Sequence, residues 1–271
     1  MSRFSEALRS HWPEYLMEAA GLGAFMISAA AFGVLLEHPA SPVRAAIPDP
    51  FSRRALMGLA MALTAVCIIH SPWGKRSGAH INPAVTLTFL RLGKVAPADA
   101  LFYVMAQFAG GAAGLLAASA LLRGALRDPS VNYVATLPGA PGAGVAWAAE
   151  AAITFVLMLV ILGVSNHPRL NRFTGLAVGT LVAAYITFEA PLSGMSMNPA
   201  RTLASALPPA LWSDLWIYFT APPLGMLAAA QVYLVAGGAR RVHCAKLHHA
   251  NAQRCIFRCR FGELAAGDRS E

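Results

Sequence analysis

Two copies of one ten-residue stretch carry the residue types in this chain that are best suited to bind a small polar molecule. Residues 77–86 read SGAHINPAVT and residues 193–202 read SGMSMNPART, with the same residue at six of the ten positions. In each copy Asn-Pro precedes a short apolar run, and Asn is a favoured helix N-cap while Pro is favoured at the first helical position. If the side-chain oxygens of Asn82 and Asn198 cap their own helices, their amide NH2 groups remain as donors. Two such helices meeting end to end would also bring two positive dipole ends to one point.

The composition is that of a membrane protein. The chain has 271 residues, of which 56% are hydrophobic and 13% are charged, whereas a soluble domain has about 25% charged residues. The net charge of +8 therefore indicates basic residues at the cytoplasmic face of a membrane, in contact with lipid, and no nucleic-acid partner is expected. The four cysteines do not form the framework of a secreted disulfide-rich protein.

Six apolar segments are long enough, or nearly so, to span a bilayer: 13–36, 54–70, 100–122, 144–163, 173–188 and 215–236. The apolar runs 83–89 and 199–207 are too short to span, and each begins at an Asn-Pro-Ala motif. We therefore expect an all-α membrane protein of six transmembrane helices plus two re-entrant half-helices. Because each half has three spans, the halves, about 13–123 and 144–236, must form an inverted repeat with a site at the bilayer midplane.

The distribution of Lys and Arg predicts the orientation. With both termini inside, the inner segments hold fifteen Lys and Arg residues and the outer loops five. The positive-inside rule therefore places the N-terminus (1–12) and a basic tail containing Cys and His (237–271) in the cytoplasm, on either side of a channel domain at 13–236. The inner residues are Arg3, Arg9, Lys75, Arg76, Arg91, Lys94, Arg169, Arg172, Arg240, Arg241, Lys246, Arg254, Arg258, Arg260 and Arg269.

Small residues at a spacing of four indicate close helix contacts. Gly110 and Gly114 lie in the third span, and Gly175 and Gly179 lie in the fifth. Small-xxx-small faces let helix backbones approach in a bilayer. The alternative is a chance occurrence in a sequence rich in Ala and Gly.

These motifs resemble those of the aquaporins, the major intrinsic protein family. The residues that carry the resemblance are SGAHINPAVT at 77–86, Asn-Pro-Ala-Arg at 198–201, and one glutamate early in each half, Glu18 and Glu150. It covers about residues 13–236. The resemblance implies a passive channel in the plasma or inner membrane, a homotetramer with one pore per subunit, no enzymatic activity and no required cofactor.

The resemblance also implies the roles of the pore residues. Asn82, Pro83 and Ala84 and then Asn198, Pro199 and Ala200 would form the two pore motifs, with both Asn amides donating to a permeating oxygen and so excluding protons. Arg201 would lie at an outer constriction, where its charge repels cations; the alternative is an arginine that snorkels to the interface. Spacing within the family assigns the rest of the constriction to Ile186, Met195 and either Met61 or Ala62.

The preferred solute stays open at this point. The absence of a His near position 186 and the presence of Met195 differ from strict water channels of the family. Thr202, Ala206 and the pair Tyr218-Phe219 differ from its glycerol channels. The stretch at 193–203 resembles the plant intracellular branch, which passes various small neutral solutes. We expect water and other small uncharged solutes to permeate, with a glycerol-type facilitator as the alternative.

Glu18 and Glu150 lie inside apolar runs, where a carboxylate is costly and indicates function. One interpretation is a proton-coupled secondary transporter that uses both as a proton relay. The resemblance favours a structural role, in which each accepts N–H groups from the unwound chain before a half-helix. His80 is a further candidate for the inner wall of the pore.

The C-terminal tail contains a candidate metal site. Cys244, Cys255 and Cys259, together with His248 or His249, form a Cys3His set of the kind that binds zinc tetrahedrally. The spacing of Cys255 and Cys259 suits one face of a helix. The alternative is a basic amphipathic tail lying on anionic lipid, with cysteines that are incidental or acylated.

Overall fold

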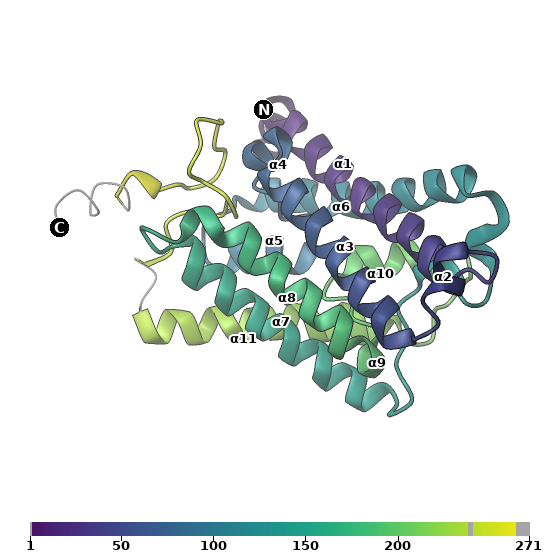
Figure 1. Cartoon of the computed structure of the whole chain (residues 1–271). Helices are drawn as coiled ribbons and strands as arrows, with labels where there is room; N and C mark the ends of the chain where they lie inside the picture. The colour runs from purple at the N-terminus through teal and green to yellow at the C-terminus, as the bar shows by residue number, and fades with distance from the viewer. Residues whose placement is uncertain (1, 238–240, 264–271) are drawn as a thin grey trace.

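The computed structural model describes residues 2–237 and 241–263, and the regular structure within these ranges is helical. Within the described ranges, six long helices form the bundle in Figure 1, and between them lie five short α-helices and three 3-10 helices. Arg240 and Arg269, two of the basic residues assigned to the inner face, lie outside the described residues. The long helices are α1 (Arg3–Glu37), α3 (Pro50–His70), α6 (Pro97–Leu121), α7 (Ala143–Ser165), α8 (Thr174–Phe188) and α11 (Leu215–Gly237). The shorter elements are α2 (Pro42–Ala46), α4 (Pro72–Ser77), α5 (Pro83–Arg91), η1 (Arg123–Arg127), η2 (Asn132–Val134), η3 (Asn171–Phe173), α9 (Ala190–Ser193) and α10 (Pro199–Ala206).

The predicted six-span architecture is present, with a short fifth span. Among the described residues, five helices are long and apolar enough to cross a membrane. The remaining long helix, α8, has 15 residues and so extends about 22 Å, less than the ~30 Å of a hydrocarbon core. The helical path continues beyond it, because Glu189 keeps helical dihedral angles and leads directly into α9.

The first helix begins earlier than the sequence indicated. We expected a span from residue 13 and a separate polar N-terminus, but α1 starts at Arg3, with Ser2 as its N-cap and Pro13 inside the helix. Polar contacts to α6 hold the extension in place: Asp99 Oδ1 lies 2.7 Å from His11 Nδ1 and accepts from the Tyr15 hydroxyl at 2.7 Å. The apolar run begins only at Pro13, so the sequence pattern did not show that the polar residues before it continue the helix.

The helices pack through the two predicted small-residue motifs. A Cβ placed on Gly110 would overlap the Ala19 carbonyl of α1, and a Cβ on Gly114 would overlap the backbone of Gly23. On α8, a Cβ on Gly179 would lie 2.6 Å from Val66 of α3. Both motifs are therefore close-approach sites, one between α1 and α6 within the first half and the other between α3 and α8, which joins the two halves.

The two Asn-Pro-Ala motifs begin short buried helices, as predicted. α5 is capped by Asn82 and α10 by Asn198, and both Asn residues have extended dihedral angles while the following Pro takes the first helical position. The helices have only 9 and 8 residues, and they contact each other near the centre of the bundle. They are half-helices enclosed by the long ones.

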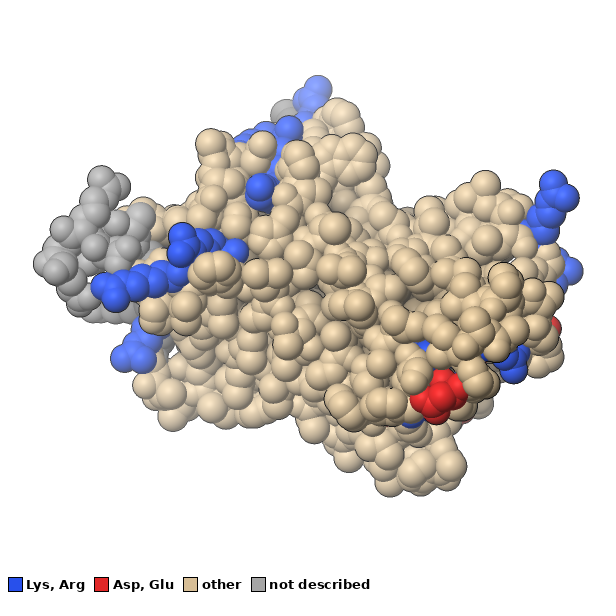
Figure 2. Space-filling view, in the orientation of Figure 1, with Lys and Arg blue, Asp and Glu red and all other residues tan. Residues whose placement is uncertain are grey.

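The surface agrees with a multi-pass membrane protein. On the face shown in Figure 2, charged side chains lie towards the two ends and the broad middle is formed by uncharged residues. Large apolar side chains are exposed along the long helices, as lipid contact requires. They include Leu59, Leu63, Leu101, Met105, Leu116, Leu224 and Val235.

Candidate functional site

The chain unwinds in the same way before each Asn-Pro-Ala motif. Three equivalent pairs of residues have positive φ angles: Gly78 and Gly194, Ala79 and Met195, and Ile81 and Met197. This region of φ is unfavourable for residues with a Cβ, so the surroundings must hold the conformation in place. Because these unwound stretches lack helical hydrogen bonds, their backbone N–H groups need other partners inside the protein.

Glu18 of α1 accepts the donors of the first unwound stretch. Its Oε1 accepts from the backbone N–H of His80 at 3.1 Å and from the Ser77 hydroxyl at 2.7 Å. Its Oε2 accepts from the backbone N–H of Ile81 at 2.6 Å and from the side-chain amide of Gln107 at 2.8 Å. The side chain is fully buried, and these four bonds compensate for its removal from water.

Glu150 of α7 makes the equivalent contacts in the second half. Its Oε1 accepts from the Ser196 N–H at 2.6 Å and the Ser193 hydroxyl at 2.9 Å, and its Oε2 accepts from the Met197 N–H at 2.7 Å. Like Glu18, Glu150 is 0% exposed. Neither carboxylate lines the two cavities described below, so the geometry is that of a brace for the unwound chain.

Sequence reasoning missed three further members of this scaffold. The Tyr103 hydroxyl donates to the Ser77 carbonyl and the Tyr218 hydroxyl donates to the Ser193 carbonyl, each at 2.6 Å. Gln107, the third, is fully buried and bonds Glu18. The available signal was a polar side chain inside an otherwise apolar span, where the alternative to an internal partner is an unsatisfied group in hydrocarbon.

The side-chain oxygens of the two Asn residues cap their own helices. Asn82 Oδ1 accepts from the Ala84 N–H at 2.9 Å, and Asn198 Oδ1 accepts from the Ala200 and Arg201 N–H groups at 3.0 and 3.3 Å. The caps fix both amide planes, so the NH2 groups point away from their own helices. The cap geometry is the one that the motif predicted.

The amide nitrogens then cross between the halves. Asn82 Nδ2 donates to the Met197 carbonyl at 2.7 Å, and Asn198 Nδ2 donates to the Ile81 carbonyl at 2.8 Å. An amide NH2 group has two N–H donors, so one donor on each Asn has no bond to a described residue. Both Asn residues line the same cavity, where that second donor is available to a small molecule.

An outer cavity of about 250 Å³ contains the predicted constriction residues Met61, Ile186, Met195 and Arg201 in its wall. Of the two alternatives on α3, Met61 lies in this wall and Ala62 does not. Ala62 faces α8 instead, where its carbonyl oxygen would be 3.2 Å from a Cβ on Gly179. Counting residues back from the motif could not decide between Met61 and Ala62, because the intervening loop can differ by one residue. Adjacent residues point about 100° apart around a helix, so the packing of Ala62 against Gly179 directs Met61 to the cavity.

An inner cavity of about 90 Å³ continues from the outer one. It is lined by both Asn residues and by His80, and beyond them by the C-terminal segment residue Leu247. The two cavities have five wall residues in common, so they lie end to end along one path. The common residues are Phe25, Val182, Ser196, Met197 and Arg201.

Arg201 lies where the two cavities meet. Its Nη1 is buried and has no hydrogen-bond partner among the residues that the structure describes. An unpartnered guanidinium N–H in a cavity wall is available to a solute oxygen, and the fixed charge opposes cations. The buried Nη1 in the cavity wall favours the predicted constriction role over an arginine that snorkels to the interface.

His80 is held by polar and aromatic neighbours on the inner side of the motif. Its Nδ1 lies 3.0 Å from the Thr86 hydroxyl and its Nε2 lies 2.8 Å from the Ala245 carbonyl. Its ring stacks on Phe257 at a centroid distance of 5.3 Å. Two of these three partners belong to the C-terminal segment, which therefore reaches the inner end of the path.

The C-terminal segment brings three cysteines and one histidine together. The side chains of Cys244, His249, Cys255 and Cys259 each offer one ligand atom, and these atoms lie within 4.8 Å of one another. The predicted ligand His248 is not a member, because it packs against His70 at a centroid distance of 4.8 Å. Sequence spacing could not distinguish the two adjacent histidines.

The helix expected around Cys255 and Cys259 is absent. Residues 242–260, all of them described, form bends and irregular backbone with no helix or strand. Two of their peptide groups form hydrogen bonds with the first half of the chain. The Leu247 N–H donates to the Gly78 carbonyl at 3.1 Å, and the Arg258 N–H donates to the Lys94 carbonyl at 2.9 Å. These contacts to the helix bundle replace the internal bonds that a helix would make.

Comparisons with known proteins agree with this geometry. The family model "Major intrinsic protein" matches residues 9–233. Aquaporin NIP1-3 of rice is 39% identical over 171 residues, which is 62% of this chain and 58% of the relative. Probable aquaporin AqpM of Archaeoglobus fulgidus is 39% identical over 65% of this chain and 74% of its own length. The alignments thus cover between about half and three-fifths of the first plant relatives.

A solved structure shares the fold. The X-ray structure of the aquaglyceroporin from Plasmodium falciparum aligns with a TM-score of 0.67 at 21% identity, covering 83% of this chain and 96% of that one. The fold and site together define a multi-pass integral membrane protein. It is built as an inverted repeat in which each half contains three long helices and one half-helix. The chain belongs to the major intrinsic protein family.

Proposed function

We propose that the chain forms a passive transmembrane channel for water and other small uncharged solutes. The observation that carries this proposal is the pair of Asn amides, each with one N–H left for a permeating oxygen inside a continuous path. A water molecule that accepts from both amides cannot also pass a proton along the file. The positive N-terminal ends of α5 and α10 meet there and add a barrier to cations.

The channel has no chemical step and needs no coupling ion. Glu18 and Glu150, the carboxylates that a proton-coupled transporter would use, are braces whose oxygens accept backbone N–H groups. A relay carboxylate must exchange protons with a water path, and neither residue lines the cavities. Solutes therefore move down their own gradients.

The chain would lie in a plasma or inner membrane with both termini in the cytoplasm. The excess of Lys and Arg on the inner segments supports this orientation. We also propose a homotetramer with one pore per subunit, as the family resemblance implies. The apolar side chains exposed on the long helices suit contact with lipid and with neighbouring subunits.

A glycerol-type facilitator is the second candidate, and one observation favours it. Three of the four constriction residues, Met61, Ile186 and Met195, are apolar, and Arg201 alone among these four has polar side-chain donors. An apolar wall opposite one arginine suits the carbon backbone and hydroxyls of a polyol. Water and small polyols would then share the path.

Stopped-flow light scattering on proteoliposomes tests the proposal, with sucrose and then glycerol as osmolyte. Because Leu247 forms part of the inner end of the path, the measurement includes the Leu247→Ala variant. Shrinkage in sucrose faster than in empty liposomes, by the full chain or by this variant, is the expected result. Rapid re-swelling in glycerol assigns the second candidate. No acceleration by either protein would contradict the channel.

A further inference from the structure

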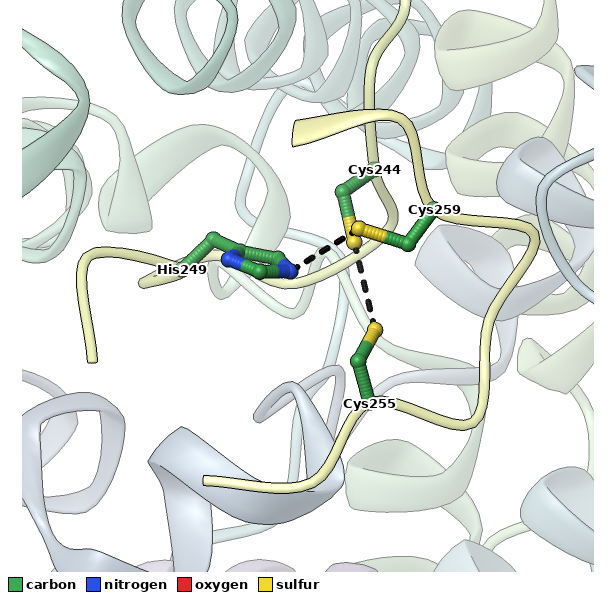
Figure 3. Close-up of side chains that lie close together, drawn as sticks. All are labelled: Cys244, His249, Cys255 and Cys259. Atoms are coloured by element: carbon green, nitrogen blue, oxygen red, sulfur yellow. Dashed lines mark hydrogen bonds between the residues drawn. The ribbon is translucent and has the colours of Figure 1, made fainter. Parts of the chain in front are cut away.

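The C-terminal segment, residues 241–263, folds into a cluster of thiols at the inner end of the molecule. Figure 3 shows Cys244, Cys255 and Cys259 converging with the ring of His249. Cys244 is 4% exposed, and none of the four side chains lines either of the two cavities of the path. Cys67, the fourth cysteine of the chain, lies apart on the exposed surface of α3.

The distances match a tetrahedral zinc site. With Zn–S bonds near 2.3 Å, two sulfur ligands of a tetrahedral zinc lie about 3.8 Å apart, and a sulfur and a nitrogen ligand lie slightly closer. The Cys244 and Cys255 sulfur atoms are 3.6 Å apart, and His249 Nε2 is 3.0 Å from the Cys259 sulfur. With all four atoms within 4.8 Å of one another, small side-chain adjustments give the full tetrahedron.

The chemistry of the donor set also fits. Three cysteine sulfurs and one histidine nitrogen form a Cys3His set, one of the ligand sets that zinc takes in tetrahedral structural sites. Three thiolates, a neutral imidazole and Zn²⁺ have a net charge of −1. Lys246, Arg254, Arg258 and Arg260 in the same segment supply compensating positive charge.

The ring of His249 is oriented towards the sulfur atoms. It stacks on Phe261 with a centroid distance of 4.2 Å and an interplanar angle of 16°, which directs Nε2 to Cys259. His248 points to His70 on the helix bundle instead. His249 is therefore the expected ligand, and the adjacent His248 is a matched control for mutagenesis.

The cluster closes a loop that lies across the inner end of the path. Between Cys244 and His249 the chain places the Ala245 carbonyl on His80 and Leu247 in the cavity wall with both Asn residues. Between Cys255 and Cys259 it places Phe257 against His80 and Gly78. Lys246 is 2% exposed, and its Nζ donates to the carbonyls of Gln253 and Arg254 at 3.0 and 2.7 Å. These bonds connect the part of the loop that contains Cys244 with the part that contains Cys255.

We propose that Cys244, His249, Cys255 and Cys259 bind one Zn²⁺ and that the metal holds the C-terminal segment as a plug over the inner mouth of the pore. Binding connects the two parts of the segment that contact His80, so metal release frees Leu247 and Phe257 together. Free Zn²⁺ at about 100 times its dissociation constant raises the ratio of folded to unfolded segment about 100-fold. The plug part of this proposal rests on the channel function, and the metal site does not.

Metal analysis of the purified full chain tests the site. We expect one Zn²⁺ per chain, retained in Cys67→Ser and His248→Ala and lost in Cys255→Ser and His249→Ala. Co²⁺ added to the metal-free chain should give the sulfur-to-cobalt charge-transfer absorption of a tetrahedral thiolate site in the first pair only. Retention of metal by His249→Ala with loss in His248→Ala would overturn the ligand assignment. A wild-type chain that binds no Zn²⁺ and gives no cobalt spectrum would overturn the site.

Water permeability in proteoliposomes tests the plug. We expect Zn²⁺ to slow osmotic shrinkage of the wild type at least several-fold relative to the chelator-treated protein. The Leu247→Ala variant should bind one Zn²⁺ and stay fast with or without it, because its metal site is intact while its side chain no longer fills the mouth.

The outcomes separate the plug from the channel itself. Fast shrinkage of the wild type that Zn²⁺ does not change, with metal bound, would overturn the plug and leave the channel intact. If the wild type, chelator-treated wild type and Leu247→Ala all match empty liposomes, the channel proposal fails, and the plug fails with it. The zinc site would then still stand on the metal analysis.

Discussion

Asn82 and Asn198 each donate to the carbonyl that immediately precedes the other. Asn82 Nδ2 bonds the Met197 carbonyl at 2.7 Å and Asn198 Nδ2 bonds the Ile81 carbonyl at 2.8 Å. This exchange joins the N-terminal ends of the two half-helices and leaves one N–H of each amide for the cavity. The reciprocal pair therefore fixes both the junction and the donors of the proposed pore.

Replacing Asn198 with Asp should slow water without removing the helix cap. The carboxylate keeps the acceptor for the Ala200 N–H but loses both amide donors and places a second oxygen against the Ile81 carbonyl. Loss of about 1.4 kcal/mol of solute binding at the Asn pair would lower permeability about tenfold. The readout is stopped-flow shrinkage in the Leu247→Ala background. Asn132→Asp, in the loop element η2, serves as the control, and equal rates in the two variants would argue against a donor role.

Arg201→Ala should admit cations and protons. The guanidinium is the charge at the meeting point of the two cavities, and at 4 Å in an effective dielectric of 20 a unit charge repels another by about 4 kcal/mol. A pH-sensitive dye trapped in proteoliposomes measures the leak under a potassium diffusion potential. Arg201→Lys keeps the charge and should stay tight to protons, although it loses the planar fork of donors. A proton leak of the same size in Arg201→Ala and Arg201→Lys would contradict the electrostatic explanation.

The scaffold around the two motifs could be predicted because it repeats. Two Asn-Pro-Ala stretches, one Glu in each half and two small-residue motifs were sufficient to place the half-helices, the braces and the close helix pairs. The Asn caps and the Glu braces give partners to buried N–H groups, as any chain in hydrocarbon requires, and the small-residue motifs let helix backbones approach closely. Local sequence was therefore informative about them.

Features that depend on long-range packing could not be predicted from local patterns. Met61 and Ala62 are neighbours in sequence, and only the contact of Ala62 with Gly179 on α8 decides which one reaches the cavity. His248 and His249 are separated in the same way, by His70 on the bundle and Phe261 in the segment. The irregular C-terminal segment has no helical or strand periodicity in its sequence, because its peptide groups form hydrogen bonds with the helix bundle.

Met61→Ala should widen the constriction for polyols. Met61 is 2% exposed and shares the wall of the outer cavity with Ile186 and Met195, so truncation removes three heavy atoms from that wall. We expect glycerol permeability to rise severalfold with little change in water permeability. Ala62→Gly changes the adjacent residue, which faces α8, and should leave glycerol permeability unchanged. An increase in Ala62→Gly without one in Met61→Ala would reverse the assignment.

Gly110→Ala should destabilise the protein through the α1–α6 contact. A Cβ at Gly110 overlaps the Ala19 carbonyl, so the two helices must separate, and overpacking of this kind costs about 1–3 kcal/mol. Thermal unfolding in detergent should show a lower midpoint for this variant. Gly124→Ala is the matched control, because a Cβ there has nothing within 4 Å. Equal midpoints for the two variants would mean that α1 and α6 do not pack this closely.

Glu150→Gln should weaken the second unwound stretch without changing the pH dependence of transport. A Gln amide offers one acceptor oxygen and one NH2 group, so either the Ser196 or the Met197 N–H loses its partner and faces a donor. An unsatisfied buried N–H costs about 1–3 kcal/mol, which should lower the unfolding midpoint relative to the exposed control Glu6→Gln. Water flux between pH 5 and 8 should keep the wild-type profile, because a brace takes no part in proton exchange. A requirement for a proton gradient in the wild type that disappears in Glu150→Gln would favour the proton-coupled transporter.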